Sequence, residues 1–409
     1  MSAEQPRSHG YTPVVWVDDC GPPESTSTVG FTRFRQANSV LAAALMSSPA
    51  PASAAGATEA DKVYVANSGR DFDGEVGPHN IAIFTVRADG GLTPFGDPVP
   101  TGMGARSLEF SPNGRFAYLA AIEENAVYSY AVDRAGGLTG FSPVRTGGRS
   151  PFGLAVAPDG RSLYTANIGS GTVATFRVRE SGVPVLAGTT ATEQPNPRNV
   201  LVSRDGQFLF VSHGLPNSAG PDALVLFPIL PGGTLDRPRP SVAIGGGGTG
   251  MARTPDGRFL YIACSGTNDV YAFHVGRNGA LNPVPGQPFP APRTPEGVTV
   301  TPDGTRLYVT SVASQPEPNP TEAGVWTFAI SDDGALDPLG PRIGPGLGPG
   351  VVAAADGERL YTGNFFGNTV SAFTIATGPP EEIADSPYSS RGTAPGFDAV
   401  AIRPRTTRE

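Results

Sequence analysis

The chain reads Pro302-Asp303-Gly304-Thr305-Arg306-Leu307-Tyr308-Val309-Thr310 at one point, and this unit recurs along most of its length. Its Asp-Gly pair precedes a short strand of alternating apolar residues with an aromatic residue in the middle. Asp-Gly and Asn-Gly readily adopt the positive φ of tight hairpins, so each copy predicts an antiparallel strand pair. The copies of the turn are Asn113-Gly114, Asp159-Gly160, Asp205-Gly206, Asp256-Gly257, Asp303-Gly304 and Asp356-Gly357.

Aromatic residues recur in step with these turns, about 50 residues apart. A second aromatic follows each one on a further alternating segment, and Gly-Leu or Gly-Ala-Leu pieces then indicate a turn into a fourth strand. Seven four-stranded units of about 45 residues are typical of a β-propeller. The first set is Tyr64, Tyr118, Tyr164, Phe210, Tyr261, Tyr308 and Tyr361, and the second set is Phe84, Tyr130, Phe176, Phe227, Phe273, Phe328 and Phe373.

The first unit lacks its own innermost strand, because the chain reaches Lys62-Val63-Tyr64 without a preceding turn. Residues 397–404 resemble residues 151–158, which form the innermost strand of a complete unit. We therefore expect the last segment to pair into the first blade and close the ring, which removes exposed sheet edges. The sequence predicts an all-β, seven-bladed propeller of four-stranded antiparallel blades over residues 61–405, followed by a tail at 406–409.

Composition excludes several other classes of protein. The 409 residues include 54 Gly and 43 Pro, which rules out long helices and coiled coils. A net charge of -8 without a basic cluster argues against nucleic acid as a partner. No apolar stretch is long enough to span a bilayer. We expect a monomer that needs neither a metal nor a cofactor.

Residues 1–60 lack the repeat, and we expect them to be disordered. Within them, segment 33–55 has two arginines, a short apolar run and a small-residue run in the order of a secretory signal. If it is a signal, the protein is secreted or lies at the cell surface. If it is only a disordered tail, the protein is cytoplasmic.

The repeats, in particular 157–167 and 302–310, resemble the YVTN-type repeats of the lactonase family of seven-bladed propellers, which includes proteins similar to 6-phosphogluconolactonase and carboxymuconate-lactonising enzyme. The resemblance covers about residues 62–404. It implies a Pro-Arg-His on one inner strand and a Glu shortly after the next aromatic. The matching positions here are Pro197-Arg198-Asn199 and Val211-Ser212-His213, so the Arg is kept whereas the His and the Glu are replaced.

The loops between second and third strands vary in length, and the long ones at 67–80, 213–222 and 311–322 share one face. Binding residues are usually found on such loops. Alignment of the inner strands by their turns places seven residues at one equivalent position near the opening of the central channel on that face, which we call the mouth position. Its residues are charged, polar or aromatic, whereas most residues at the next position are small. The mouth position holds Arg106, Phe152, Arg198, Thr249, Glu296, Pro349 and Asp398, and the next holds Ser107, Gly153, Asn199, Gly250, Gly297, Gly350 and Ala399.

In an enzyme, Arg198 and Arg106 hold a carboxylate, a phosphate or a developing oxyanion. His213 is then the candidate general base, and Glu296 or Asp398 is the acid or the group that orients the histidine. In the structural alternative, the arginines simply pair with these acids, and His213 is solvated. Further candidates for substrate binding are Phe152, Thr249, Asp398, Asn67, Asn167 and Asn364. In the structural alternative, the three asparagines cap strand ends.

Two functions follow from this pattern. The first is a metal-independent lactone hydrolase or lactonising enzyme that acts on a small acidic lactone in the central funnel. The second is a non-catalytic secreted propeller that binds a protein or polymer through the face with long loops.

Overall fold

The computed structural model describes residues 61–70, 76–215, 218–311, 324–339, 350–353, 357–375 and 379–404, with backbone alone at 350–353 and Phe397. The predicted disordered segment with its candidate signal, the predicted tail, Pro349, and most of the loop at 311–322 lie outside the described residues. None of the helices in the described ranges is long and apolar enough to cross a membrane.

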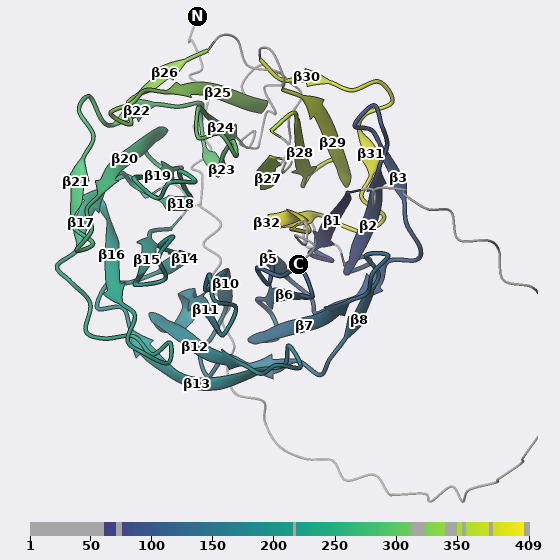
Figure 1. Ribbon diagram of the computed structural model, residues 1–409, viewed down its shortest axis with the longest axis horizontal. Coiled ribbons are helices and arrows are strands. Elements are labelled where there is room, and N and C mark those ends of the chain that lie inside the picture. Colours follow the sequence, from purple (N-terminus) through teal and green to yellow (C-terminus); the bar gives the residue numbers. More distant parts are fainter. Residues whose placement is uncertain are drawn as a thin grey trace, which may run out of the picture. The chain divides into compact units, whose positions relative to one another are not determined.

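Seven antiparallel sheets surround a central axis, as the sequence predicts (Figure 1). From the axis outward, the first three are β32 (Pro395–Ile402), β1 (Lys62–Asn67), β2 (Asn80–Val86) and β3 (Leu92–Pro94); β5 (Ala105–Phe110), β6 (Phe116–Ala121), β7 (Ala126–Val132) and β8 (Leu138–Gly140); and β10 (Pro151–Val156), β11 (Ser162–Asn167), β12 (Thr172–Val178) and β13 (Pro184–Ala191). A 3-10 turn, η1 (Ile168–Ser170), connects β11 to β12.

The other four sheets follow the same order. They are β14 (Pro197–Val202), β15 (Phe208–His213), β16 (Asp222–Pro228) and β17 (Val242–Ile244); β18 (Gly248–Arg253), β19 (Phe259–Cys264), β20 (Asp269–Val275) and β21 (Leu281–Pro283); β23 (Pro295–Val300), β24 (Arg306–Ser311), β25 (Gly324–Ile330) and β26 (Leu336–Pro338); and β27 (Gly350–Ala353), β28 (Arg359–Asn364), β29 (Thr369–Thr374) and β30 (Glu381–Glu382). Short strands β4 (Val99–Pro100), β9 (Val144–Arg145), β22 (Phe289–Pro290) and β31 (Tyr388–Ser389) add to the third strands of four blades.

The C-terminal strand closes the ring, which confirms the prediction. Strand β32 pairs with β1, so that Val65 lies opposite Val400. At the other end of the pair, Pro395 lies opposite Asn67. The strand therefore begins two residues earlier than the predicted start at Phe397. Its register with β1 is irregular between Pro395 and Val400, around Asp398.

Hydrogen bonds between blades explain why the second-strand aromatic is usually a tyrosine. The hydroxyl of Tyr261 donates to the carbonyl of Gly334, 3.0 Å away in the next blade. That glycine has a φ of 88°, and a Cβ on it would lie 2.4 Å from the Phe259 ring. The repeat thus requires tyrosine and glycine together. The other pairs of this kind are Tyr64–Gly136, Tyr118–Gly182, Tyr164–Gly233 and Tyr361–Gly90.

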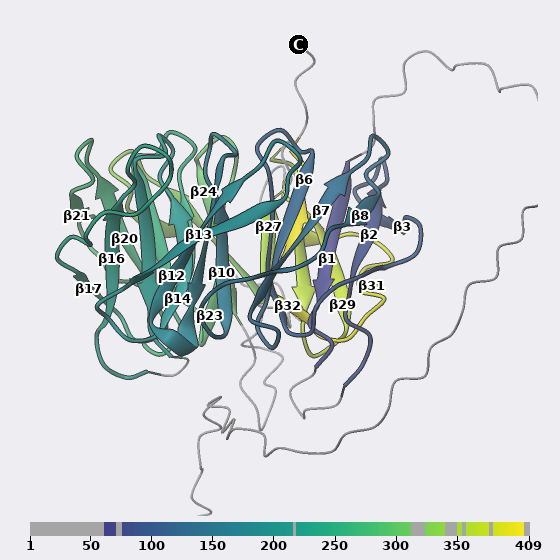
Figure 2. The same ribbon diagram turned by 90° about the horizontal axis from the view of Figure 1, so that it is seen from below.

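Apolar side chains of neighbouring blades interdigitate to form the core. All fourteen repeat aromatics of the second and third strands are at most 2% exposed. Because these aromatic side chains are almost completely buried and closely packed, they hold the inner strands at fixed positions around the axis. The inner strands, such as β10, β14 and β32, run between the two faces of the ring (Figure 2) and form a rigid support for the side chains at their ends.

Candidate functional site

Three inner strands start at a residue that is fixed from the preceding blade. Ser150, Thr294 and Ala394 stand directly before inner strands, and all three have positive φ values. Their backbone N–H groups donate to Asn125, Asn268 and Asn368, respectively, at 2.6 to 2.7 Å. These asparagines lie in the tight turns between second and third strands, which places the strand starts at the same mouth of the ring.

A bulge follows these starts and turns one side chain out of the strand pairing. Around Arg198, the register shifts between Pro197 opposite His213 and Asn199 opposite Ser212. The same shift occurs around Glu296 on β23. Bulges re-aim side chains and are common beside active sites. Here they turn the mouth residues of different blades toward one another.

Close approach of the strands explains the small residues at the next position. A Cβ on Gly250 would lie 2.4 Å from the carbonyl oxygen of Glu296. A Cβ on Gly153 would lie 2.4 Å from the side-chain oxygen of Asn199. The mouth therefore narrows to a cavity of about 200 Å³, including its part open to solvent, lined by Phe152, Arg198, Asn199, Thr249, Gly250, Glu296 and Asp398.

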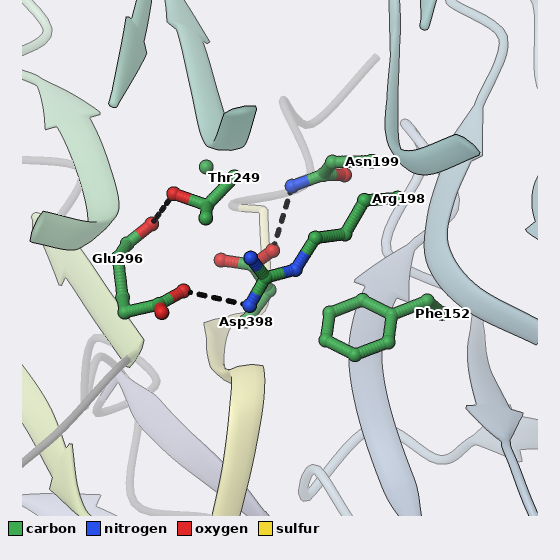
Figure 3. Close-up of a pocket in the computed structure, with 7 residues that line it drawn as sticks. Phe152, Arg198, Asn199, Thr249, Glu296 and Asp398 are labelled. Atoms are coloured by element: carbon green, nitrogen blue, oxygen red, sulfur yellow. Dashed lines mark hydrogen bonds and ion pairs between the residues drawn. The ribbon is translucent and has the colours of Figure 1, made fainter. Parts of the chain in front are cut away.

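A buried ion pair crosses this cavity. The Arg198 Nη2 atom lies 3.0 Å from Glu296 Oε2, and the two side chains are only 3% and 6% exposed (Figure 3). Burial raises the pKa of Glu296, and the charge and hydrogen bond of Arg198 oppose that rise. Removal of either partner leaves a buried charge without compensation, which is costly.

The second polar pair joins Asn199 to Asp398. The Asn199 amide nitrogen donates to Asp398 Oδ2 at 2.8 Å (Figure 3). Its orientation is fixed because its oxygen accepts the backbone N–H of Val200, also at 2.8 Å. Asp398 has a φ of 48°, a conformation that non-glycine residues rarely adopt and that marks a strained, locally over-determined position.

The environment of Asp398 gives its carboxyl group a pKa close to neutrality. The side chain is half-buried, yet the convergent inner strands surround it and reduce its solvation. This burial raises the pKa of Asp398 to about 6; the hydrogen bond from Asn199 lowers it, the nearby Glu296 charge raises it and Arg198 lowers it. A carboxylate of this kind is ionised at neutral pH and can still accept a proton efficiently.

The Phe152 ring contacts a second arginine, Arg106, as well as Arg198. The guanidinium carbons of Arg198 and Arg106 lie 5.2 and 5.6 Å from the centre of the Phe152 ring. Cations at this distance are attracted to the ring face. Burial and the like charge of Arg198 lower the pKa of Arg106 to about 10, so it remains a cation at neutral pH.

Thr249 lines the cavity but bonds to the backbone. Its hydroxyl lies 3.0 Å from the Glu296 carbonyl and 3.2 Å from the Ala263 carbonyl. It therefore ties β18 to β23 and fixes the backbone of Glu296.

Arg106 contacts the Phe152 ring but is not among the residues that line the cavity. Four further predicted site residues also lie outside the lining. His213 is buried, with Nδ1 3.3 Å from the Ala223 carbonyl, and burial lowers the pKa of His213 to about 4. The amide of Asn67 donates to Asn80 and Ser390. Asn167 and Asn364 donate to hydroxyls on the adjacent third strand. The asparagine contacts are those of the structural alternative, in which these residues cap strand ends. For His213 that alternative was wrong, because the side chain is buried at the end of β15 and not solvated.

The role of Asn199 as the partner of Asp398 was not predicted from the sequence. The two residues are 199 positions apart, and only the closure of the ring brings them together. Among the described residues, no group of three His, Cys, Asp or Glu side chains is placed to hold a metal ion.

Comparison with known proteins confirms the resemblance that the repeats indicate. A model of the lactonase, 7-bladed beta-propeller family matches residues 73–219. No curated protein matches the sequence significantly.

Solved structures share the fold at low sequence identity. A putative 6-phosphogluconolactonase from Bacteroides uniformis has a TM-score of 0.69 at 19% identity, over 84% of this chain and 100% of that chain. A periplasmic gluconolactonase from Pseudomonas aeruginosa has a TM-score of 0.69 at 20% identity, over 85% and 99% of the two chains. Hydrazine synthase of Kuenenia stuttgartiensis also matches, with a TM-score of 0.57 at 20% identity over 76% and 96%. The fold thus hosts different activities, and function must be argued from the site.

Proposed function

We propose that this lactonase-like propeller hydrolyses small lactones that carry a carboxylate, and that Asp398 is the general base. The observation that carries the proposal is the Asn199–Asp398 pair beside the Arg198–Glu296 pair in one cavity. Active sites commonly combine carboxyl groups of raised pKa with fixed cations. The match to the lactonase family model supports the reaction class.

Each side chain has a defined task in this reaction. Arg198 binds the carboxylate of the substrate, and Phe152 contacts the ring of the lactone. Asn199 holds the carboxylate of Asp398 in place. Arg106 lies on the Phe152 ring outside the cavity lining, and its charge attracts the anionic substrate toward the mouth.

The proposed reaction needs only water and the lactone. Asp398 accepts a proton from water while the water oxygen attacks the carbonyl carbon. The tetrahedral intermediate then collapses, the bond to the ring oxygen breaks, and Asp398 returns the proton to that oxygen. The product is a hydroxy acid, whose new carboxyl group releases a proton to solvent.

Asp398 replaces His213 as the proposed base because of where the two side chains lie. A general base must reach the water that it activates, directly or through one further water. Asp398 lines the cavity, whereas the Nδ1 atom of His213 faces the Ala223 carbonyl in its own blade.

The pH dependence of the reaction follows from the pKa of Asp398. A protonated Asp398 cannot accept a proton, so kcat, measured at saturating lactone so that substrate binding does not contribute, is expected to fall about tenfold per pH unit below about 6 and to level off above it. Initial rates between pH 4.5 and 8, corrected for spontaneous ring opening, measure this profile. A rate that stays constant down to pH 4.5, in a protein shown to remain folded, would contradict the assignment.

A panel of lactones tests the proposed function itself. We expect turnover of five-ring lactones that bear a carboxylate, such as 5-oxotetrahydrofuran-2-carboxylate. Arg198→Ala should lower kcat/KM at least about 30-fold, because it removes the cation of a buried charge pair. The matched control is Arg161→Ala, in an exposed turn. Failure to open any lactone would reject the proposal in favour of the non-catalytic binding alternative.

A further inference from the structure

In the free protein, the Glu296 carboxylate is paired with the Arg198 guanidinium, which is the cation that the proposed substrate needs. A carboxylate on Arg198 is the arrangement expected when an acidic lactone is bound. In the structure, that carboxylate is the side chain of Glu296, with its Oε2 atom 3.0 Å from Arg198 Nη2 (Figure 3).

We propose that Glu296 is a specificity-determining residue that stands in for the substrate carboxylate, leaves Arg198 when an anionic ligand binds, and takes up one proton as it does so. This inference rests on the proposed function, since it concerns the same cavity. It adds a reason why the site selects anionic over neutral lactones.

The size of the cavity is the first argument. With the ion pair in place, the enclosed space leaves only about 10 Å³ for the centre of a water molecule, which is room for about one water. A five-membered lactone ring needs more room than the free site provides. Movement of the Glu296 side chain would both enlarge the cavity and expose the Arg198 guanidinium. Glu296 is the partner free to move, because its backbone carbonyl is held by Thr249 while its carboxylate oxygen Oε2 bonds only to Arg198 among the described residues.

The balance of charge is the second argument. Among the described residues, the charged groups that act on Glu296 are Arg198 on β14 and Asp398 on β32. Glu109 on β5 in turn lies near Asp398, and Arg106 on β5 lies near Arg198 and Glu123. If a ligand carboxylate took Arg198 while Glu296 stayed ionised, three carboxylates would lie around this one guanidinium. Burial already raises the pKa of Glu296 even with Arg198 beside it. Uptake of one proton by Glu296 restores the charge of the free site.

Selectivity follows from this exchange. A neutral lactone has no group that compensates Arg198 for the loss of Glu296, so it must break a buried ion pair without replacing it. An anionic lactone replaces one carboxylate by another. The preference for an acidic ring is therefore built into the free protein.

The test uses pyrrolidone-5-carboxylate, a lactam that has the shape of an acidic five-ring lactone but resists hydrolysis, and 2-pyrrolidone as the neutral control. Calorimetric titrations at pH 7 in HEPES and in Tris, which differ in ionisation enthalpy, count the protons taken up per ligand. We expect close to one proton for the wild type with the acid, and at least tenfold weaker binding of the neutral lactam.

Two variants identify the group that takes up the proton. Glu296→Gln should bind the acid without proton uptake, whereas Asp398→Asn should bind it with the uptake unchanged. If Glu296→Gln does not fold, the wild-type proton count and the comparison of the two lactams still decide. Binding without proton uptake, equal affinity for the two lactams, no binding of the acid, or loss of the uptake in Asp398→Asn alone would each overturn the inference.

The result is separable from that for the proposed function. Turnover of acidic lactones without proton uptake on binding would reject the role of Glu296 and leave the hydrolase proposal standing. Absence of turnover on the lactone panel would reject the hydrolase proposal itself.

Discussion

Asp398→Asn is expected to lower kcat for lactone hydrolysis by about 10²- to 10⁴-fold, the usual contribution of a general base. The substitution preserves the shape of the side chain, and its amide oxygen can still accept the hydrogen bond from Asn199. It removes the ability to accept a proton from water. KM should change little, because Arg198 and Phe152 still contact the substrate.

Steady-state rates of the purified variant measure this effect. The matched control is Asp97→Asn, the same chemical change in an exposed loop, which should retain full activity. In Asp398→Asn, the residual rate should also lose the pH dependence near 6. Asp398→Asn turning over within a factor of three of the wild type would show that the base lies elsewhere, and His213 would then be the next candidate.

Deletion of residues 396–409 is expected to abolish cooperative folding of the propeller. The deletion removes nearly all of β32, which is the innermost strand of the first blade and pairs with β1. It also removes Ala399 and Val400 from the cores on either side of that blade. The exposed edge of β1 would then be free to pair with other chains. We expect aggregated protein without a sharp thermal transition.

Thermal unfolding followed by circular dichroism, with light scattering for aggregation, checks this expectation. A deletion of residues 405–409 alone is the control, since it leaves β32 intact and should unfold like the full chain. A deletion from residue 396 that unfolds at the wild-type temperature would mean that the ring does not depend on this strand.

The sequence was sufficient to predict the fold because the repeat is built from local signals. An Asp-Gly turn determines a hairpin through the backbone conformation it permits. The tyrosine recurs because in five of the blades it donates a hydrogen bond to a glycine carbonyl of the next blade, as Tyr261 does to Gly334. Because such a pair joins neighbouring blades, the tyrosine and the glycine recur once per blade along the sequence.

The predicted mouth residues came together because the turns gave their alignment. Arg198 and Glu296 are 98 residues apart, yet equal positions on two inner strands placed both at one cavity. Tertiary contacts could not be predicted in the same way. His213 immediately precedes a long loop, and nothing in the sequence shows that its ring is buried against the Ala223 carbonyl.

Local irregularities were the hardest features to predict. From Val65 to Asn67 strand β1 advances two residues while β32 spans five, from Val400 to Pro395, and the three extra residues around Asp398 are visible only when this register is known. The partnership of Asn199 with Asp398 depends on that same segment. Bulges break the period of two on which strand alignments rely, so residues beside them have no counterpart in the other blades.

The proposal that a carboxylate at the propeller mouth activates water is tested most directly by oxygen labelling. A single turnover of 5-oxotetrahydrofuran-2-carboxylate in H₂¹⁸O, with enzyme in excess, shows which oxygen enters the product. General-base catalysis by Asp398 predicts one ¹⁸O atom in the new carboxylate of the hydroxy acid. Unlabelled product, whose oxygen would have come from an enzyme carboxylate, or no product at all, would contradict it.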